Sequence, residues 1–501
     1  MKNSLFCVVC CLLILSMVMA VFSGCGNHDK SPVETLPSGD RADDDHEIQY
    51  NVAPEDLGDF ELDVLTVKSG TWNMHTDFAP ENMSGDRIND AVYDRNLAIE
   101  QEYNCIIVSH EDAEYYSGVE KLSLDQLSGT NLYDTAYVEG SSVVSLITQG
   151  LLHNLYDIPE LQLEQNWWSQ LIKKEATIGS NKYATLYFMQ SNLSLTAFDL
   201  TWCVYFNKSI HENYQLEDLY DLVRTDKWTV ESMQTVARAV ANLNGEETYS
   251  YTETGRSVYG ITTYWNGAKA MLDGCNVQFV ISNFDDEFVS NIQNERFMNL
   301  AQRLAQLFGE QGTFTYGGAS TTGTTTGNAS DYIKIFNANR ALFCIAEVKS
   351  SVSDFSTFQG DFGILPLPKY DEAQEGYRSW VNYLAPVLVI PKSTQGDTLH
   401  KTGLLLDALS FYSERDVLPE YYDRVLKGRG VKDADSSEML DLINETKSFD
   451  ASIAYGWSRQ FSEVVSTTIL AGVTDVSSLI EQYDGMISEK IKETMDSIFE
   501  D

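Results

Sequence analysis

Several loops of the chain place an aromatic ring beside polar side chains, a combination that could bind a ligand without reacting with it. Sugars present apolar ring faces and many hydroxyl groups. They therefore suit aromatic stacking combined with hydrogen bonds from Asp, Asn, Glu and Arg. We expect ligand contacts from Trp72, Asn73, Glu139, Ser141, Trp265, Glu347, Trp380 and Asn382.

The tryptophans could instead belong to the core. Trp380 follows the polar residues 377–379, which predicts that its ring is exposed, and it is the best single candidate. Trp202 lies in an apolar strand and is predicted to be a core residue. Trp72 and Trp265 could take either role, since each has polar neighbours.

Other residues near these positions point to different roles. Trp167 and Trp168 lie outside the candidate loops, and we expect them to pack on a lobe surface. Lys349 and Arg378 would favour an acidic ligand, so an anionic sugar stays open as an alternative.

Motifs of common enzyme classes are absent from the sequence. It contains no Gly-x-Ser-x-Gly, no His-Glu-x-x-His and no dinucleotide-binding glycine triplet after a strand. Its 7 histidines are too scattered to pair as metal ligands, so we expect a protein with no metal and no cofactor that is not an enzyme. A glycosidase needs only two facing carboxylates, and a glycan-acting surface enzyme therefore stays open.

The elements that would position these residues alternate between strand and helix. The pattern predicts strands over 62–70, 104–109 and 133–140 and helices over 87–103, 118–128 and 141–152. In the first helix, Ile88, Val92, Leu97 and Ile99 are expected on one buried face. This order predicts a parallel sheet, in which ligands bind beyond the carboxyl ends of the strands. The loops 69–76, 109–116 and 139–142 lie at those ends.

Length and charge restrict the function further. The chain has 501 residues, more than one core usually serves, so two or more domains are expected. Its 74 acidic and 34 basic residues give a formal net charge of −40. Such a surface repels nucleic acid and anionic lipid, so any membrane attachment must be covalent or helical.

The N-terminus indicates covalent attachment. Residues 1–24 combine a positive start with an apolar run and read as a signal peptide. Phe22-Ser23-Gly24-Cys25 resembles the lipobox of bacterial lipoproteins, which implies that Cys25 carries lipid. A polar, acidic tether is predicted over 25–59. The remaining Cys105, Cys203, Cys275 and Cys344 are expected to be buried, reduced thiols.

The body of the chain resembles bacterial extracellular solute-binding proteins of the sugar-binding type, the substrate-binding lipoproteins of ABC transporters. One matching stretch has an aromatic strand, Asn-Lys, a short helix, and Trp-Thr opening a long helix, here Tyr205, Phe206, Asn207, Lys208, Trp228 and Thr229. Four further segments match in the family's order, at 258–276, 336–350, 361–394 and 421–443. The chain departs from the family at Glu347-Val348-Lys349, where relatives often have Gly and Trp.

This resemblance implies a two-lobed, periplasmic-binding-protein-like (Venus flytrap, type II) α/β fold with a hinge. By the family's crossing pattern, lobe 1 would comprise 60–200 and 384–430, and lobe 2 would comprise 201–383 and 431–501. The implied function is capture of a saccharide by hinge closure and delivery to ABC permease subunits, on the extracellular face of the cell membrane. A monomer is the family expectation, and a sensor or adhesin lipoprotein with the same fold stays open.

Overall fold

The computed structural model describes residues 50–71, 74, 78–180, 183–252, 254–282, 287–316, 330–427 and 434–499. The signal segment, Cys25, Trp72 and Asn73 lie outside these ranges. Tyr50–Asp501 form one compact unit. Within the described ranges, no helix combines the length and the apolar character that crossing a membrane requires.

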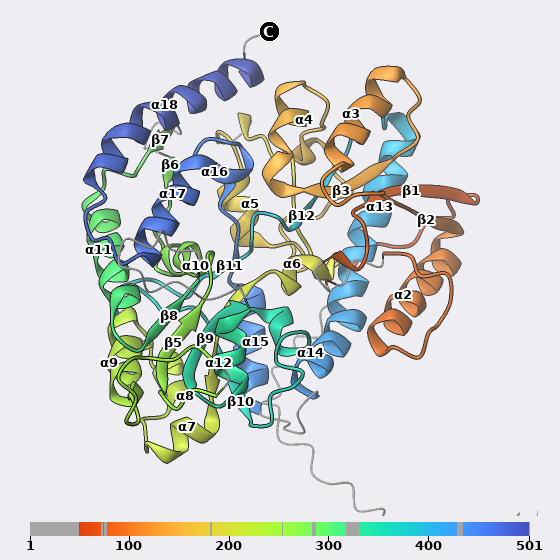
Figure 1. The fold of residues 1–501 in the computed structure, drawn as a ribbon. Coiled ribbons are helices and arrows are strands. Elements are labelled where there is room, and N and C mark those ends of the chain that lie inside the picture. The colour runs from red at the N-terminus through yellow and green to blue at the C-terminus, as the bar shows by residue number, and fades with distance from the viewer. Residues whose placement is uncertain are drawn as a thin grey trace, which may run out of the picture. The chain divides into compact units, whose positions relative to one another are not determined.

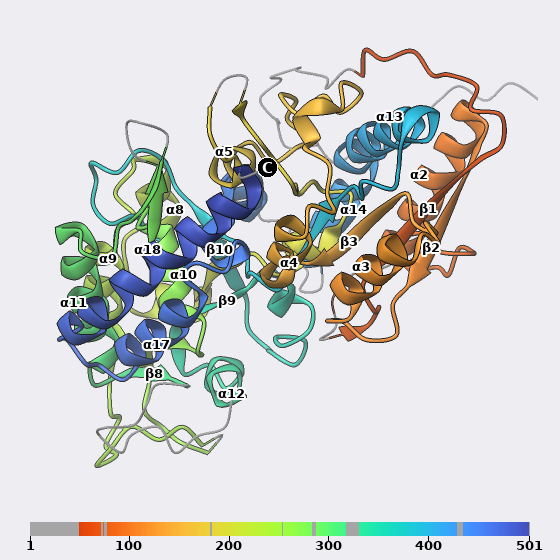
Figure 2. The same cartoon turned by 90° about the horizontal axis from the view of Figure 1, so that it is seen from above.

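Two separate sheets organise this unit (Figures 1 and 2). The first sheet has the order β12-β3-β1-β2, formed by Pro386–Val389, Thr135–Glu139, Phe60–Thr66 and Cys105–Glu111. β1 is parallel to β2 and β3, as predicted, whereas β12 returns antiparallel to β3. We call this sheet, with the helices packed on it, the first lobe.

Helices of the first lobe follow the sequence pattern closely. They are α2 (Arg87–Tyr103), α3 (Gly118–Ser128), α4 (Val144–Thr148) and α13 (Gly396–Tyr412), and the bounds of α2 and α3 are those predicted. Asp86 caps α2 by accepting from the amides of Ile88 and Asn89. The expectation for Leu97 is wrong: it is 37% exposed, because it lies on the opposite side of the helix from Val92 and Ile99.

The second sheet has five strands and defines the second lobe. Its order is β10-β4-β9-β5-β8, formed by Phe362–Leu365, Trp202–Asn207, Ala341–Glu347, Tyr259–Thr263 and Thr313–Thr315. β9, β5 and β8 are parallel, and β4 runs antiparallel between β10 and β9. Helices packed on this lobe are α7 (Lys208–Asn213), α8 (Leu219–Arg224), α9 (Val230–Val240), α11 (Glu295–Gly309), α12 (Asp331–Asn337) and α15 (Ala434–Glu445).

The motif residues of the resemblance have structural roles here. Asn207 caps α7 by accepting from the Ile210 amide at 3.0 Å. Thr229 forms a capping box with Ser232 at the start of α9. Trp228 is buried and donates its indole N–H to Pro366 O at 2.9 Å. These residues therefore shape the lobe rather than a ligand site.

The chain passes between the two sheets in segments that lie side by side. The Asn382 amide donates to Leu200 O at 3.0 Å, and the Val381 amide donates to Ser448 O at 2.8 Å. β11 (Ser379–Trp380) pairs in parallel with β13 (Lys447–Ser448). These three paired segments form the junction of the lobes.

The remaining elements surround the junction and the C-terminus. They are α5 (Gln170–Ala176), α6 (Leu195–Asp199), α10 (Gly267–Gly274), α14 (Leu418–Lys427), α16 (Ala451–Ala454), α17 (Arg459–Leu470), α18 (Ser477–Phe499), and the β6–β7 hairpin of Val280–Ser282 and Phe288–Ser290. Short 3₁₀ turns cover Gly140–Ser142, Leu155–Asp157 and Val348–Ser351, and a π-helical stretch at Ser413–Val417 joins α13 to α14.

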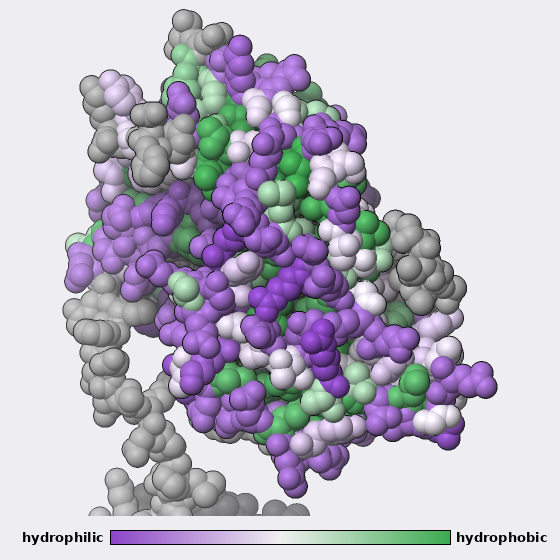
Figure 3. All heavy atoms as spheres, turned by 90° about the vertical axis from the view of Figure 1, so that its left-hand side faces the viewer, coloured by the Kyte–Doolittle hydropathy of each residue, from purple (hydrophilic) through white to green (hydrophobic). Residues whose placement is uncertain are grey.

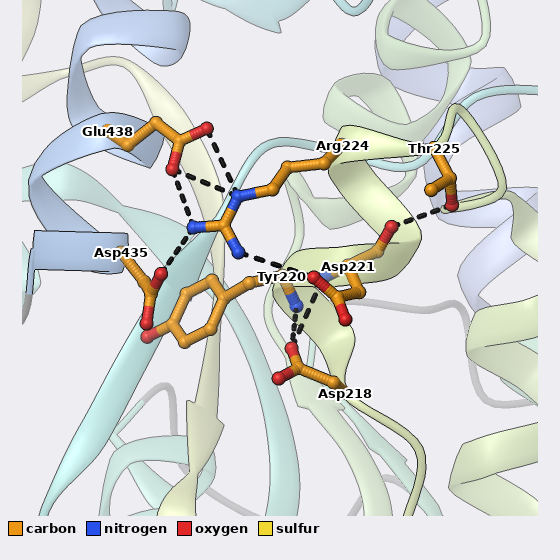
Figure 4. Close-up of polar contacts among 7 residues, drawn as sticks. All are labelled: Asp218, Tyr220, Asp221, Arg224, Thr225, Asp435 and Glu438. Carbon is orange, nitrogen blue, oxygen red and sulfur yellow. Dashed lines mark hydrogen bonds and ion pairs between the residues drawn. The ribbon is translucent and has the colours of Figure 1, made fainter. Parts of the chain in front are cut away.

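The surface matches the acidic composition. Figure 3 faces α11 and α18 and shows hydrophilic residues over most of this side, with hydrophobic residues in small separate groups. Ion pairs also link elements at the surface. Arg224 on α8 binds Glu438 of α15 at 2.6 Å and Asp221 of its own helix at 3.4 Å (Figure 4).

Residues 50–59, which the sequence assigns to the tether, contact the first lobe. Leu57 is 3% exposed, and its amide donates to Tyr103 O at 2.8 Å. Tyr50 stacks on Phe411 with ring centroids 5.0 Å apart. All four cysteines of the described residues are buried free thiols, as predicted.

Candidate ligand-binding site

Strands of both sheets end at a common place. Tyr115 follows β2, is 3% exposed, and donates its hydroxyl to Leu384 O at 2.8 Å. Burial raises the pKa of Tyr115, and the charges of Glu139 and Glu347 raise it further. Glu139 ends β3 of the first sheet and Glu347 ends β9 of the second. The tyrosine therefore lies in the field of one carboxylate from each lobe.

Glu139 and Ser141 form the first-lobe part of this cluster. Glu139 is 2% exposed and accepts from the Ser141 amide at 3.2 Å and from the Ser141 hydroxyl. Its second oxygen, Oε2, is buried and has no hydrogen-bond partner among the described residues. Gly140 between them is required, since a Cβ there would lie 2.7 Å from the Phe449 ring. An unpaired carboxylate oxygen is a natural acceptor for a ligand hydroxyl.

Glu347 and Asn382 form the second part. The side-chain amide of Asn382 donates to Glu347 Oε1 at 3.2 Å, and Lys349 Nζ lies 3.4 Å from Glu347 Oε2. Both Glu347 and Asn382 are buried. Burial and the nearby Glu347 carboxylate raise the pKa of Tyr264, which follows β5. The structure thus brings four predicted residues, Glu139, Ser141, Glu347 and Asn382, to the junction of the lobes.

The prediction that Trp380 is exposed is wrong. Its side chain is 1% exposed and packs between Trp202 and Tyr383, with ring centroids 6.0 and 6.3 Å away. The polar residues before it do not face solvent, because Arg378 is itself buried in ion pairs with Glu175 at 2.6 Å and Asp273 at 2.9 Å. Trp202 is fully buried, as predicted.

Of the two candidate tryptophans in the described ranges, Trp265 has the accessible ring. It is 49% exposed and makes an edge contact with Tyr316 at 5.5 Å. Its carbonyl accepts from the Ser466 hydroxyl at 2.8 Å, which holds the loop after β5 against α17. A ring fixed by its backbone and open to solvent can stack on a sugar face.

A cavity of about 530 Å³ lies at the carboxyl end of the first sheet. Thr66 and Val67 at the end of β1 line it together with Tyr137 of β3, which is level with Thr66 in the register. Polar groups from α2, α6 and α14 complete its wall, among them Ser84, Asp86, Asn89, Ser194, Thr196 and Arg424. This volume is within the range of small-molecule sites. The predicted contacts Trp72 and Asn73 belong to the loop after β1.

Four cations near the site are paired with carboxylates, and a fifth, Arg459, donates to the backbone O of Ser141 at 3.4 Å. Lys349 contacts Glu347, and Arg378 is shared by Glu175 and Asp273. Lys269 is 4% exposed and binds Glu463 at 2.6 Å, and Arg424 in the cavity wall binds Asp86 at 2.8 Å. These pairs neutralise four of the positive charges that would attract an anion.

Sequence reasoning missed the tyrosines that join the cluster. Tyr383 lies beside Glu463, and its hydroxyl donates to that carboxylate at 2.6 Å. Tyr115 lies in the loop after β2, and Tyr264 directly follows β5. The electrostatic interaction of Tyr115 with Glu347 joins residues 232 positions apart, and Tyr264 follows a strand of the same lobe as Glu347 but lies 83 positions before it, so no local pattern reveals either proximity. No group of residues in the described ranges could hold a metal ion.

The fold is similar to those of solved bacterial solute-binding proteins. The sugar-binding protein MalE from Xanthomonas citri gives a TM-score of 0.57 at 12% identity, over 88% of this chain and 99% of its own. A second similar structure is the galacto-N-biose/lacto-N-biose I-binding protein of an ABC transporter from Bifidobacterium longum, solved with lacto-N-biose. Its TM-score is 0.52 at 12% identity, over 87% of this chain and 98% of its own. A third is an ABC substrate-binding protein from Listeria monocytogenes, solved with cycloalternan. Its TM-score is 0.51 at 11% identity, over 87% of this chain and 99% of its own.

No protein-family model and no curated protein sequence matches the chain. The likeness to solved structures therefore concerns the fold, and it agrees with the two sheets and the paired crossing segments described above. The chain has the two-lobed α/β fold of ABC solute-binding proteins, as the sequence resemblance predicts.

Proposed function

We propose that the protein is a receptor that captures an uncharged saccharide at the junction of its two lobes. The observation that carries this proposal is that the crossing segment 382–385 contacts strand ends of both sheets. Asn382 donates to Glu347 Oε1 at 3.2 Å, Leu384 O accepts from the Tyr115 hydroxyl at 2.8 Å, and Ala385 O accepts at 3.2 Å from the amide of Gly140, which follows Glu139. Carboxylates and tyrosines supply acceptors, donors and ring faces for a hydroxyl-rich ligand. Solved proteins with this fold include ones crystallised with oligosaccharides, which supports the same ligand class.

Hinge closure is the proposed mechanism. The lobes, divided as the sequence predicts, would rotate about the three crossing segments. Ligand would stabilise the closed form by adding contacts to the second lobe. Trp265, Glu347 and Asn382 would make those contacts, and Glu139, Ser141, Trp72 and Asn73 would bind from the first lobe.

The receptor would serve an ABC importer at the extracellular face of the membrane. A lipid on Cys25 would hold it there, and the permease subunits would receive the ligand from the closed form. Loss of membrane association after Cys25→Ser, with secretion retained, would support the anchor; unchanged membrane association would contradict it.

The test is a thermal-shift screen of the full-length protein against neutral mono- and oligosaccharides, uronic acids and amino acids. A ligand at a hundredfold excess over its Kd stabilises by about 2.7 kcal/mol, which moves the midpoint by several degrees. A neutral saccharide should give the largest shift. Shifts from uronic acids alone, or turnover of a glycan into products, would contradict the proposal.

A further inference from the structure

The second lobe contains a cavity of about 360 Å³ along β8, the edge strand of its sheet. Tyr259, the first residue of β5, and Thr313, the first residue of β8, line it. The candidate site at the junction instead adjoins Tyr264 and Glu347, beyond the carboxyl ends of β5 and β9. Along β8 the cavity extends as far as Thr315, which pairs with Thr263 at the end of β5, but Glu139, Ser141, Glu347 and Asn382 are not among the residues that line it.

Four aromatic rings form one wall of this cavity. Tyr249 and Tyr259 have ring centroids 5.1 Å apart, and Phe314 lies 6.2 Å from Tyr259. Tyr251 adds a ring 6.3 Å from Phe314. Such a wall presents several faces on which an apolar ring face can stack.

Hydrogen bonds from Arg340 fix the loop that carries Tyr249 and Tyr251. Arg340 is 6% exposed and donates to Ser250 O at 2.9 Å, to Ser257 O at 3.2 Å and to Thr252 O. At its far end, Glu246 accepts from the amides of Arg256 and Ser257. The tyrosines are therefore preorganised, which lowers the entropic cost of binding.

Backbone alone forms part of the cavity's floor. The C-terminal ends of α11 and α17 meet at Gly309 and Gly472. A Cβ built on Gly472 would lie 3.0 Å from the Gly309 Cα. Gly472 also has a φ of +73°, a conformation that only glycine adopts readily. Glycine at both positions therefore allows the two helix ends to approach this closely.

The chemistry of the lining selects against anions. No lysine, arginine or histidine is among the described residues that line the cavity. Two carboxylates line the cavity. Glu310 already accepts hydrogen bonds from Arg238 at 2.9 Å and Gln234 at 2.6 Å, so the exposed Glu247 is the carboxylate at the rim that can accept from a ligand. Ring faces, hydroxyl groups and one carboxylate form the set that recognises an uncharged sugar.

We propose that this tyrosine-lined cavity is a second saccharide-binding site, separate from the site between the lobes. It would bind one or two sugar units on the outside of the second lobe. It does not depend on lobe closure, and it stands or falls independently of the proposed transport function.

The experiment uses full-length Glu347→Gln protein, in which the junction site is weakened, and saturation-transfer NMR with neutral glucose- and galactose-based mono- to tetrasaccharides. Binding should remain in this variant, and adding Tyr251→Ala should weaken it about tenfold, the effect of losing one stacking ring. Tyr214→Ala provides a matched control, because Tyr214 is a 40% exposed tyrosine of the same lobe outside the cavity.

A second variant guards against misfolding. Thr248 is an exposed rim residue, and Thr248→Arg should block the cavity without removing any core contact. Loss of binding in both variants, with unchanged melting temperature in Thr248→Arg, supports the site. No residual binding in Glu347→Gln, or residual binding that neither variant changes, overturns it.

Discussion

Asn382 donates its side-chain amide to Glu347 Oε1 at 3.2 Å, so the segment between β11 and β12 is joined to the end of β9. The same asparagine accepts from the Leu384 amide at 3.1 Å, which forms the turn that enters the first lobe. One residue therefore fixes both the crossing segment and a carboxylate of the candidate site. In the proposed mechanism, this position would couple the hinge to the ligand.

Asn382→Ala should weaken saccharide binding and lower stability together. The buried Glu347 carboxylate loses a donor and the Leu384 amide loses an acceptor, a cost of about 1–3 kcal/mol. Asn382→Asp keeps the turn acceptor but places a second carboxylate against the buried Glu347, so it should lose at least as much affinity and stability as Asn382→Ala. Calorimetric titration and urea unfolding of the three proteins measure both quantities. Full affinity in Asn382→Asp would contradict the proposed coupling.

Arg378→Ala should be strongly destabilising. Arg378 bridges Glu175 of α5 and Asp273 of α10 while it is 6% exposed, and its loss leaves two buried carboxylates without their cation. Removing one partner of a buried ion pair costs about 3–5 kcal/mol. Arg224→Ala is the matched control, since Arg224 is 35% exposed and its pairs with Asp435 and Glu438 are screened by solvent. That variant should lose at most about 1 kcal/mol. Equal losses in urea unfolding would contradict this ranking.

The stability of the protein should fall as pH rises from about 4 to about 6 through Asp450. Burial raises the pKa of Asp450 to about 6, and the neighbouring Asp273 carboxylate raises it too, although Ser452 lowers it by hydrogen bonding. The folded state therefore holds this proton more tightly than the unfolded chain, whose aspartates titrate near 3.9. The contribution, of order 3 kcal/mol, is complete below pH 4 and lost above pH 6.

Asp450→Asn tests this pH dependence. Asparagine can still cap α16 by accepting from the Ser452 amide, which Asp450 does at 3.0 Å. The difference in unfolding free energy between wild type and variant should change across this pH range, with the variant gaining relative stability above pH 6. A difference that stays constant from pH 4 to pH 7 would show that Asp450 does not titrate there.

Asp407→Ala should destabilise the first lobe by about 3 kcal/mol or more. Asp407 is fully buried and accepts from the indole nitrogens of Trp167 at 3.0 Å and Trp168 at 2.9 Å and from the Gln162 amide at 3.0 Å. Its loss leaves two buried indole donors and two partly buried donors of Gln162 without this acceptor. Asp407→Asn keeps one acceptor and should lose less. Thermal unfolding followed by tryptophan fluorescence compares them, and equal midpoints for both variants would contradict the role of the hydrogen bonds.

The sequence predicts the first lobe well because its pattern is local. The bounds of α2 and α3 follow from capping and apolar spacing, and the strand ends shift by one to four residues from the predicted ranges. The helix predicted over 141–152 is shorter and covers only Val144–Thr148. Trp167 and Trp168, expected on a lobe surface, are buried because Asp407 accepts both indole N–H groups. That partner lies about 240 positions away in the chain.

The candidate site could be predicted in part. Glu139 and Glu347 are identifiable because each ends an apolar strand, where parallel sheets place their ligand loops. The burial of Trp380 could not be predicted, because its polar neighbour Arg378 is neutralised by Glu175 and Asp273, which come from two distant helices. Long-range ion pairs of this kind leave no periodic signal in the sequence.

The central claim is that one saccharide contacts both lobes through Glu139 and Glu347. Calorimetric titration of wild type, Glu139→Gln and Glu347→Gln with the saccharide found in the thermal-shift screen tests it most directly, with the exposed Glu493→Gln as a control. A hydrogen bond to a charged group is worth about 1.5–3 kcal/mol, so each of the two variants should bind at least tenfold more weakly. If either variant binds as tightly as wild type, the ligand does not bridge the lobes at this place.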